Sequence, residues 1–329
     1  MGSKLSLNAA RSQPQISTMT DTNLPPQPNA RSPLWRKFLP RLTPYFFLLP
    51  AAIVLGLTVF WPAFQAFYFS FFEYDLINEP QWVGLANFQR LWADEVFWQT
   101  LRNTLLYLVC VVPVLTLVPL ALAILVNQRL RGMGWFRAAY YTPVVISMVV
   151  AGIAWNWLYA ENGFFNQILT YLGLIKEPGI PWLTAPGWAL FSVMAVTVWK
   201  GLGYYMAIYL AGLQTISAEL YEAAAIDGSD GLRKHWDVTL PLMRPYLLLV
   251  MVISSISATK VFEEIYIMTQ GGPRNSSKTI VYYVYEQAFL PPEIDYSYAC
   301  TIGLVLFLMI LGLSLLRLAI GGRQAIAGD

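Results

Sequence analysis

The sequence contains few charged residues. Asp, Glu, Lys and Arg make up only 12% of its 329 residues, whereas 57% are hydrophobic. Soluble domains carry about 25% charged residues, so this deficit disfavours a water-soluble fold and favours a chain embedded in a lipid bilayer. The formal net charge is only +2, which provides no electrostatic footprint for a nucleic-acid partner.

Cysteine and histidine are also scarce. The two cysteines, Cys110 and Cys300, lie in apolar stretches, where cysteine usually behaves as a small hydrophobic residue. The single histidine, His235, cannot build a His-rich metal site. No pair of nucleophile and base is apparent either. We therefore expect no metal site, no catalytic residue and no cofactor bound by this chain itself, and an enzyme is disfavoured.

The N-terminal segment differs from the rest of the chain. Residues 1–33 are rich in Ser, Gln, Asn and Pro and show no periodicity, which predicts a disordered tail. The segment lacks the basic, apolar and small-residue order of a cleaved secretion signal. One interpretation of residues 1–18 is an added leader before a start at Met19. Residues 34–329 are expected to form one domain.

Long apolar runs dominate that domain. A bilayer core of about 30 Å requires about 20 mostly apolar residues per helix. Several runs contain proline, which membrane helices tolerate when neighbouring groups satisfy the freed carbonyls. The sequence therefore predicts an all-α integral membrane protein with six transmembrane helices, at about residues 45–71, 103–126, 138–158, 187–210, 246–268 and 299–320.

The basic residues predict the orientation of these helices. Lys and Arg concentrate in cytoplasmic loops of membrane proteins. The segment before the first span and the loop after the second span are basic and contain no carboxylate. The alternate loops are acidic or mixed. Both termini should therefore be cytoplasmic in a bacterial inner membrane. The basic residues in question are Arg31, Arg36, Lys37, Arg41, Arg129, Arg131 and Arg137.

The cytoplasmic loop at residues 214–245 has its own helical pattern. Ser217 is a suitable N-cap, and Glu219 suits the positive end of a helix that begins there. A helix over residues 218–227 should end at Gly228. A second short helix is expected over residues 230–238. Three consecutive alanines in the first helix provide a slim surface for close approach of a partner.

This loop carries a resemblance to a known family. The stretch Glu222-Ala-Ala-x-Ile-Asp-Gly228, with Leu240-Pro241 downstream, resembles the EAA loop of permeases in ATP-binding-cassette (ABC) importers. The flanking Tyr209–Gln214 and Met268–Pro273 narrow it to sugar permeases similar to the membrane subunits of the maltose transporter. The similarity covers about residues 40–320.

The resemblance implies a type I importer-like fold and a set of partners. These are a second permease of the same family, two copies of a cytoplasmic ATPase that bind ATP and Mg²⁺, and an extracytoplasmic solute-binding protein. Residues 272–279 nearly form a phosphate-binding loop, but Ser277 replaces its second glycine. The resemblance also implies that five residues of the loop couple the chain to the ATPase: Glu222, Ala223, Ala224, Asp227 and Gly228.

Polar residues inside the spans are candidates for the solute path. Charged groups within a membrane are costly and are often functional. Lys260 and Glu264 are spaced i,i+4 and could neutralise each other on one helix. In the resembling family, solute contacts come from the spans on either side of the EAA loop. The candidate path residues are Lys200, Gly201, Tyr204, Ser254, Ser257, Ala258, Phe262 and Glu263.

The expected solute is a sugar or a sugar-like compound: an oligosaccharide, a glycoside such as glucosylglycerol, or a polyol derivative. Aromatic rings suit the C–H faces of sugars, and hydroxyl and carboxylate groups suit their hydroxyls. Ala258 and Val261 replace the asparagines of a maltose-type path, which disfavours maltose itself. Two alternatives stay open. Lys200 would suit a phosphate ester such as glycerol phosphate, and a secondary transporter would need no ATP but predicts inverted repeats.

Overall fold

The computed structural model describes residues 35–127, 132–176, 178–291 and 294–326. Within these ranges the regular secondary structure is helical apart from one short pair of antiparallel strands, in which Phe72 faces Trp82. The expected tail at residues 1–33 lies outside them. The elements are α1 (Trp35–Leu55), η1 (Gly56–Phe60), α2 (Trp61–Phe69), β1 (Phe72–Glu73), β2 (Gln81–Trp82), α3 (Ala86–Ala93), α4 (Glu95–Val126), α5 (Met133–Val145), α6 (Met148–Leu158), α7 (Phe164–Tyr171), α8 (Ala189–Leu213), α9 (Ala218–Ile226), η2 (His235–Thr239), α10 (Leu240–Leu242), α11 (Arg244–Thr259), α12 (Glu263–Met268), α13 (Ile280–Phe289) and α14 (Tyr296–Ile326).

The chain divides into two units, residues 1–59 and 60–329. In the first unit, the part of α1 from Tyr45 onward carries large apolar side chains that are exposed within the chain, such as Phe46 and Phe47. Exposed apolar side chains along a helix are expected where the surroundings are lipid.

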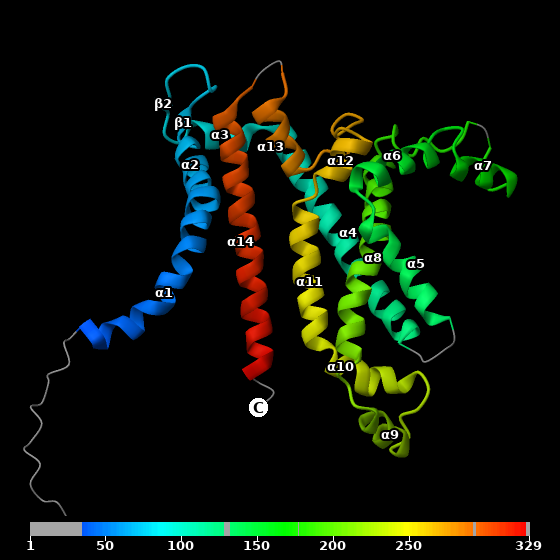
Figure 1. Ribbon diagram of the computed structural model, residues 1–329. Helices are drawn as coiled ribbons and strands as arrows, with labels where there is room; N and C mark the ends of the chain where they lie inside the picture. The colour runs from blue at the N-terminus through cyan, green and yellow to red at the C-terminus, as the bar shows by residue number, and fades with distance from the viewer. Residues whose placement is uncertain (1–34, 128–131, 177, 292–293, 327–329) are drawn as a thin grey trace, which may run out of the picture. The chain divides into compact units, whose positions relative to one another are not determined.

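The second unit is built around α4 and α8, which pack against each other along much of their length, with α11 and α5 beside them (Figure 1). Its core contains Tyr107, Val193, Tyr209 and Val250, all completely buried. The approach of α8 to α5 depends on Gly203, where an added Cβ would lie 2.1 Å from the backbone oxygen of Tyr140. Small residues at such crossings allow membrane helices to pack closely.

The helices match the predicted spans in place but not in continuity. Three are long and apolar enough to cross a membrane alone, Pro44–Phe69, α4 and α8, and the number rises to five if each of two bent pairs counts as one span. The apolar part of α14 is shorter, at Tyr296–Gly312. The count of six therefore stays a prediction.

Two of the predicted spans are broken. The predicted span 138–158 bends by 100° between α5 and α6. The predicted span 246–268 ends as an α-helix at Thr259, and α12 begins only at Glu263. Breaks of this kind leave backbone carbonyls without helical partners, so other groups must satisfy them.

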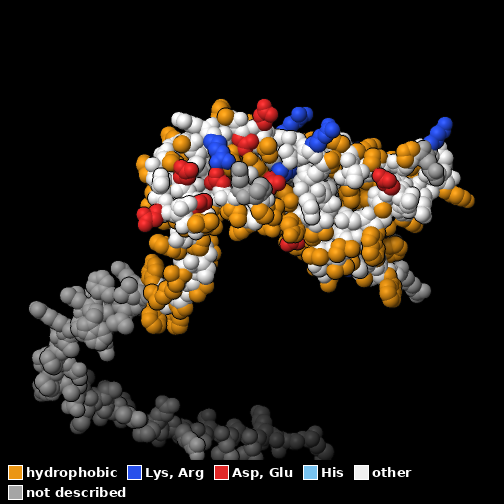
Figure 2. All heavy atoms as spheres, turned by 90° about the horizontal axis from the view of Figure 1, so that it is seen from above, with side chains coloured by type: hydrophobic (Ala, Val, Ile, Leu, Met, Phe, Trp, Pro, Cys, Tyr) orange, Lys and Arg blue, Asp and Glu red, His pale blue; other side chains and the backbone are white. Residues whose placement is uncertain are grey.

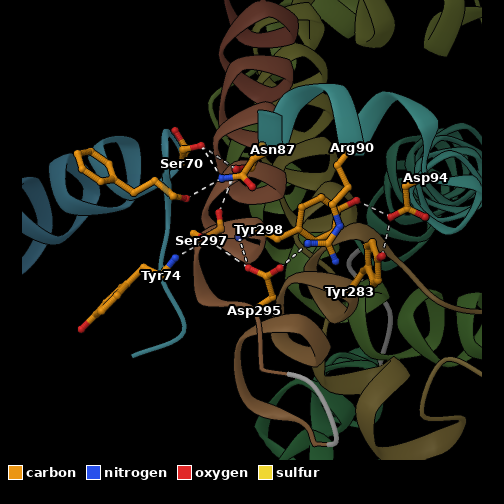
Figure 3. Close-up of polar contacts among 11 residues, drawn as sticks. Ser70, Tyr74, Asn87, Arg90, Asp94, Tyr283, Asp295, Ser297 and Tyr298 are labelled. Atoms are coloured by element: carbon orange, nitrogen blue, oxygen red, sulfur yellow. Dashed lines mark hydrogen bonds and ion pairs between the residues drawn. The ribbon is translucent and has the colours of Figure 1, made fainter. Parts of the chain in front are cut away.

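A polar network joins the ends of α3, α4, α13 and α14 on the side of the molecule opposite α9 (Figures 1 and 3). Arg90 forms an ion pair with Asp295. Asp94 accepts hydrogen bonds from the hydroxyls of Tyr283 (2.6 Å) and Tyr298 (2.5 Å), and it caps α4 by accepting from the Val96 amide (2.8 Å). Because these bonds connect segments about 200 residues apart, the network fixes this end of the unit.

Next to the network the surface is hollowed. Seen from this end, acidic and basic side chains lie among uncharged ones (Figure 2). An open pocket of about 510 Å³ is lined by Glu73, Asp75, Glu79, Arg90 and Asp295, among others. The pKa of Asp75 lies below its usual value because its carboxylate accepts hydrogen bonds from the amides of Asn78 and Ile77. The Asp75 carboxylate therefore stays ionised at neutral pH.

Replacing Asp94 tests the strength of the network. Burial alone would raise the pKa of Asp94, but bonds from the two tyrosine hydroxyls and from backbone amides outweigh it, so the pKa lies below its usual value of 3.8. We expect Asp94→Asn to keep the helix cap but to destabilise the protein by about 1–2 kcal/mol at pH 7, because two buried hydroxyls lose a charged acceptor.

The measurement is the thermal unfolding midpoint of the purified protein as a function of pH. A group with a lowered pKa stabilises the fold above its unfolded pKa, and the effect disappears as pH falls through the folded value. The difference in unfolding midpoint between Asp94→Asn and wild type should therefore have its full size at pH 7 and should disappear below about pH 4. Glu79→Gln, at an exposed site, is the control. Equal midpoints for wild type and Asp94→Asn at pH 7 would contradict the prediction.

Candidate functional site

A cavity of about 540 Å³ lies between α4, α5, α8, α11 and α12. All eight candidate path residues predicted from the sequence line it: Lys200, Gly201, Tyr204, Ser254, Ser257, Ala258, Phe262 and Glu263. They come from two stretches separated by the loop that contains α9, and the packing of α8 and α11 onto α4 brings them together.

Residues that the prediction omitted complete the wall. α4 contributes Val111 and Leu115, and α5 contributes Val144. These are ordinary apolar residues of apolar helices, so nothing in the sequence distinguishes them from lipid-facing neighbours. Thr197, Tyr205, Ile253, Lys260, Val261 and Glu264 complete the lining.

The candidate residues do not contribute equally to the cavity surface. The ring of Tyr204 is 44% exposed, and Ser257 is also exposed. Ser254, in contrast, is completely buried, and its hydroxyl donates to the Met251 carbonyl of its own helix (3.3 Å). Of the two serines, Ser257 is therefore the better placed to offer a hydroxyl to a solute. Ala258 is 3% exposed and serves mainly as packing.

Gly201 has a packing role in addition to its place in the wall. A Cβ added there would lie 2.9 Å from the Leu115 side chain and 3.4 Å from the Tyr205 ring. The absence of a side chain lets α8 approach α4 closely at the level of the cavity.

The ammonium group of Lys200 binds the backbone at the break between α5 and α6. It donates to the carbonyls of Ile146 (2.6 Å) and Pro143 (3.4 Å). Both carbonyls lie where the bend of 100° removes helical partners. Lys200 therefore satisfies two carbonyls at the helix break, and its ammonium group is only partly available to a solute.

Of the two roles that the sequence leaves open for Lys260 and Glu264, the structure does not support their pairing with each other. Within the residues that the structure describes, no ion pair joins them. The i,i+4 rule applies to a continuous helix, and here α11 ends at Thr259 before α12 begins at Glu263. Glu264 instead accepts a hydrogen bond from Thr197 (3.4 Å), whose hydroxyl is also bonded to Tyr107.

The cavity wall thus combines charges of both signs with aromatic rings. Lys200 and Lys260 face the same space as Glu263 and Glu264, and Tyr204 and Phe262 add rings. Of the two lysines, Lys200 is engaged with the carbonyls of Pro143 and Ile146, and Lys260 is exposed.

The second candidate region is the loop that contains α9. The helix spans Ala218–Ile226, close to the predicted 218–227, and Ser217 occupies the N-cap position without a side-chain hydrogen bond. Asp227 ends the helix and Gly228 follows with φ +81°. The amide of Gly228 donates to the Ala225 carbonyl (3.1 Å), and that of Ser229 donates to the Ala224 carbonyl (2.8 Å), which satisfies the helix end.

The predicted coupling residues lie on an accessible surface. Glu222, Ala223, Asp227 and Gly228 are exposed, and Ala224 is partly buried. Ile226, Leu232 and Trp236 add large apolar side chains that are 70–87% exposed. Large exposed apolar side chains therefore accompany the predicted coupling residues in this loop.

Two side-chain contacts tie α9 to the segment that leads into α11. The hydroxyls of Tyr221 and Thr239 are hydrogen-bonded (3.0 Å), and the hydroxyl of Ser229 donates to Asp237 (2.6 Å). The predicted second helix at 230–238 is shifted: η2 covers His235–Thr239, and α10 continues to Leu242. These bonds connect α9 and the turn after it to the segment just before α11, which lines the cavity.

Comparison with known proteins places these features in a family. The family described as "Binding-protein-dependent transport system inner membrane component" matches residues 91–321. The lactose transport system permease protein LacF of Rhizobium radiobacter is 34% identical over 83% of this chain and 92% of its own length. The arabinooligosaccharides transport system permease protein AraP of Bacillus subtilis is 33% identical over 92% and 96%.

Two further similarities concern a third permease and the fold. The sulfoquinovosyl glycerol transport system permease protein SmoG of Agrobacterium fabrum is 32% identical over 84% of this chain and 90% of its own length. A chain of a bacterial alginate ABC transporter, solved in complex with an alginate pentasaccharide-bound periplasmic protein, superposes with a TM-score of 0.76 at 23% identity. The superposition covers 88% of this chain and 97% of the other.

Proposed function

The chain belongs to the family of binding-protein-dependent transport system inner membrane components, and on that premise we propose that it passes a neutral saccharide or glycoside through the cavity between α8 and α11. The resemblance to sugar permeases of ABC importers is confirmed by these relatives. The observation that carries the proposal is the cavity itself, which is lined by three aromatic side chains and by Lys and Glu residues.

The size and lining of the cavity support a sugar-like solute. Ligand pockets usually measure about 300–1,000 Å³ and combine aromatic side chains with a few polar groups, and this one measures about 540 Å³. The relatives are named for lactose, arabinooligosaccharides and sulfoquinovosyl glycerol. A phosphate ester such as glycerol phosphate is the weaker candidate, because Lys200 is engaged with two carbonyls.

Coupling to ATP hydrolysis takes place at α9. Glu222, Ala223, Ala224, Asp227 and Gly228 form the surface that meets a cytoplasmic ATPase, which binds ATP and Mg²⁺. The exposed side chains of Ile226, Leu232 and Trp236 support this role. The working importer contains this chain, a second permease, two ATPase copies and an extracytoplasmic binding protein.

The orientation follows from the same proposal. The α9 end of the bundle faces the cytoplasm, together with both termini, and the end with α12 and α13 faces outward. Residues 34–329 form the permease domain with six spans in the bacterial inner membrane, two of them broken. The basic residues before the first span and after the second span support this orientation.

Solute uptake by the whole importer tests the proposal. Membrane vesicles containing all subunits are offered radiolabelled lactose, arabinotriose and glycerol phosphate with internal ATP. We expect ATP-dependent uptake of a neutral saccharide. Tyr204→Ala should lower its apparent affinity roughly tenfold, because a contact of about 1–2 kcal/mol is lost.

The matched control is Tyr171→Ala, an exposed tyrosine on α7 outside the cavity. It should leave uptake unchanged, and basal ATP hydrolysis should persist in both variants. Uptake of glycerol phosphate in place of the saccharides would refute the substrate class. Unchanged affinity in Tyr204→Ala would refute the path.

A further inference from the structure

Five aromatic rings from α12 and α13 form a continuous cluster, which we name the outer aromatic strip: Phe262, Tyr266, Tyr282, Tyr285 and Phe289. Phe262 is stacked on Tyr266 with ring centroids 5.5 Å apart and on Tyr282 at 6.2 Å. Tyr285 lies 5.1 Å from Phe262, 5.4 Å from Tyr266 and 5.6 Å from Phe289.

Helical spacing places these rings on common faces. On α13, Tyr282, Tyr285 and Phe289 are spaced i, i+3 and i+7, which puts them on one side of the helix. Phe262 and Tyr266 are spaced i and i+4 at the start of α12. The rings therefore follow one another along two adjoining helices.

Two polar contacts of neighbouring side chains also hold α13 in place. Tyr283 donates to Asp94 (2.6 Å), and the buried Lys278 forms an ion pair with Glu286. These bonds fix α13 without engaging the rings of the strip. Of those rings, Tyr282 is buried, Phe262 and Tyr285 are partly buried, and Tyr266 and Phe289 are exposed.

The strip runs from the cavity to the molecular surface. Phe262 belongs to the wall of the 540 Å³ cavity, beside Glu263. At the other end Phe289 is 61% exposed, and Tyr266 between them is 42% exposed. α12 and α13 lie on the side of the molecule opposite α9 (Figure 1), which is the side of solute arrival in the proposed orientation.

Tyrosine rings also gather in the belts of membrane proteins, where they face lipid headgroups. A belt of that kind has no reason to continue into a cavity lined by charged groups between helices, but Phe262 is both a member of the strip and part of that wall. Ring faces suit the apolar C–H faces of a sugar, and the tyrosine hydroxyls suit its hydroxyls.

We propose that the outer aromatic strip is a second solute-binding site of the permease, on which a neutral saccharide stacks before it reaches the cavity between α8 and α11. The inference rests on the proposed saccharide transport and extends it to residues outside that cavity. Tyr285 and Phe289 contact the saccharide first. The saccharide then moves past Phe262 to Tyr204 and Ser257.

The test is uptake of radiolabelled lactose and arabinotriose by membrane vesicles containing the whole importer. Tyr285→Ala and Phe289→Ala should each raise KM about three- to tenfold, with the maximal rate retained. Tyr285→Phe keeps the ring and should stay within about twofold of wild type. Tyr171→Ala, at an exposed tyrosine outside the strip, should change nothing.

The outcomes distinguish failure of the strip as a solute site from failure of the proposed function. If wild type takes up one of the saccharides and KM is unchanged in the Tyr285→Ala and Phe289→Ala double variant, the strip is not a solute site and the proposed function stands. If the variants lower only the amount of protein in the membrane, the rings serve lipid contact and the inference is also overturned. If wild type transports neither saccharide, the strip and the saccharide path fall together.

Discussion

Gly228→Pro is expected to abolish coupled uptake while the protein stays in the membrane. The residue has φ +81°, and its amide donates to the Ala225 carbonyl (3.1 Å). Proline fixes φ near −65° and has no amide hydrogen, at a cost of about 3 kcal/mol or more in an incompatible position. The turn that ends α9 and sets the direction of the following segment would therefore change its conformation.

The measurement is solute uptake together with saccharide-stimulated ATP hydrolysis, and both should fall by about tenfold or more. Gly228→Asn is the matched control, because asparagine tolerates the left-handed conformation at a helix end, and it should retain most of the uptake. Glu222→Lys, which reverses an exposed charge on α9, should also uncouple. Normal uptake by Gly228→Pro and Glu222→Lys at normal protein levels would exclude α9 as the coupling helix.

Gly203→Val is expected to prevent the bundle from forming. The Cβ of any side chain at this position would lie 2.1 Å from the Tyr140 oxygen and 3.0 Å from the Tyr141 Cα. Both neighbours are backbone atoms of α5, so the helices must separate, and overpacking of this kind costs about 1–3 kcal/mol or more. The separation would also remove packing beside the cavity.

Protein yield in the membrane and the thermal unfolding midpoint report this effect. Gly203→Val should accumulate poorly or melt well below wild type. Gly303→Val is the control, because an added Cβ on α14 meets nothing within 4 Å. A wild-type midpoint for Gly203→Val would show that α5 and α8 are not in backbone contact.

Composition and local sequence patterns are enough to predict the class of protein. The shortage of charge and the apolar runs predicted a helical membrane protein, and the loop with Glu222 and Gly228 indicated a permease of ABC importers. The relatives confirm that family. The end of α9 was also predictable, because a glycine after a helical run marks a left-handed turn whatever surrounds it.

The grouping of the path residues depends on contacts between segments that are far apart in the sequence. Tyr204 and Ser257 are 53 positions apart in the sequence, and the family resemblance, not periodicity, pointed to both. Their shared cavity exists because α8 and α11 pack onto α4. Their contact with a solute stays a prediction. The rings of the outer aromatic strip are visible in the sequence as single aromatic residues, but only the approach of α12 to α13 makes them a cluster.

Local chemistry in the sequence is enough to predict that the chain enters a membrane, where its long apolar segments lie, how α9 ends, and to which family the chain belongs. Where the helices break, and which groups meet there, depends on the packing of the whole fold. Lys200 binds the carbonyls of Pro143 and Ile146, and Glu264 turns to Thr197 and not to Lys260. The physical reason is that a freed carbonyl or a charge inside the bundle takes whichever partner the packing of distant helices brings within hydrogen-bonding distance.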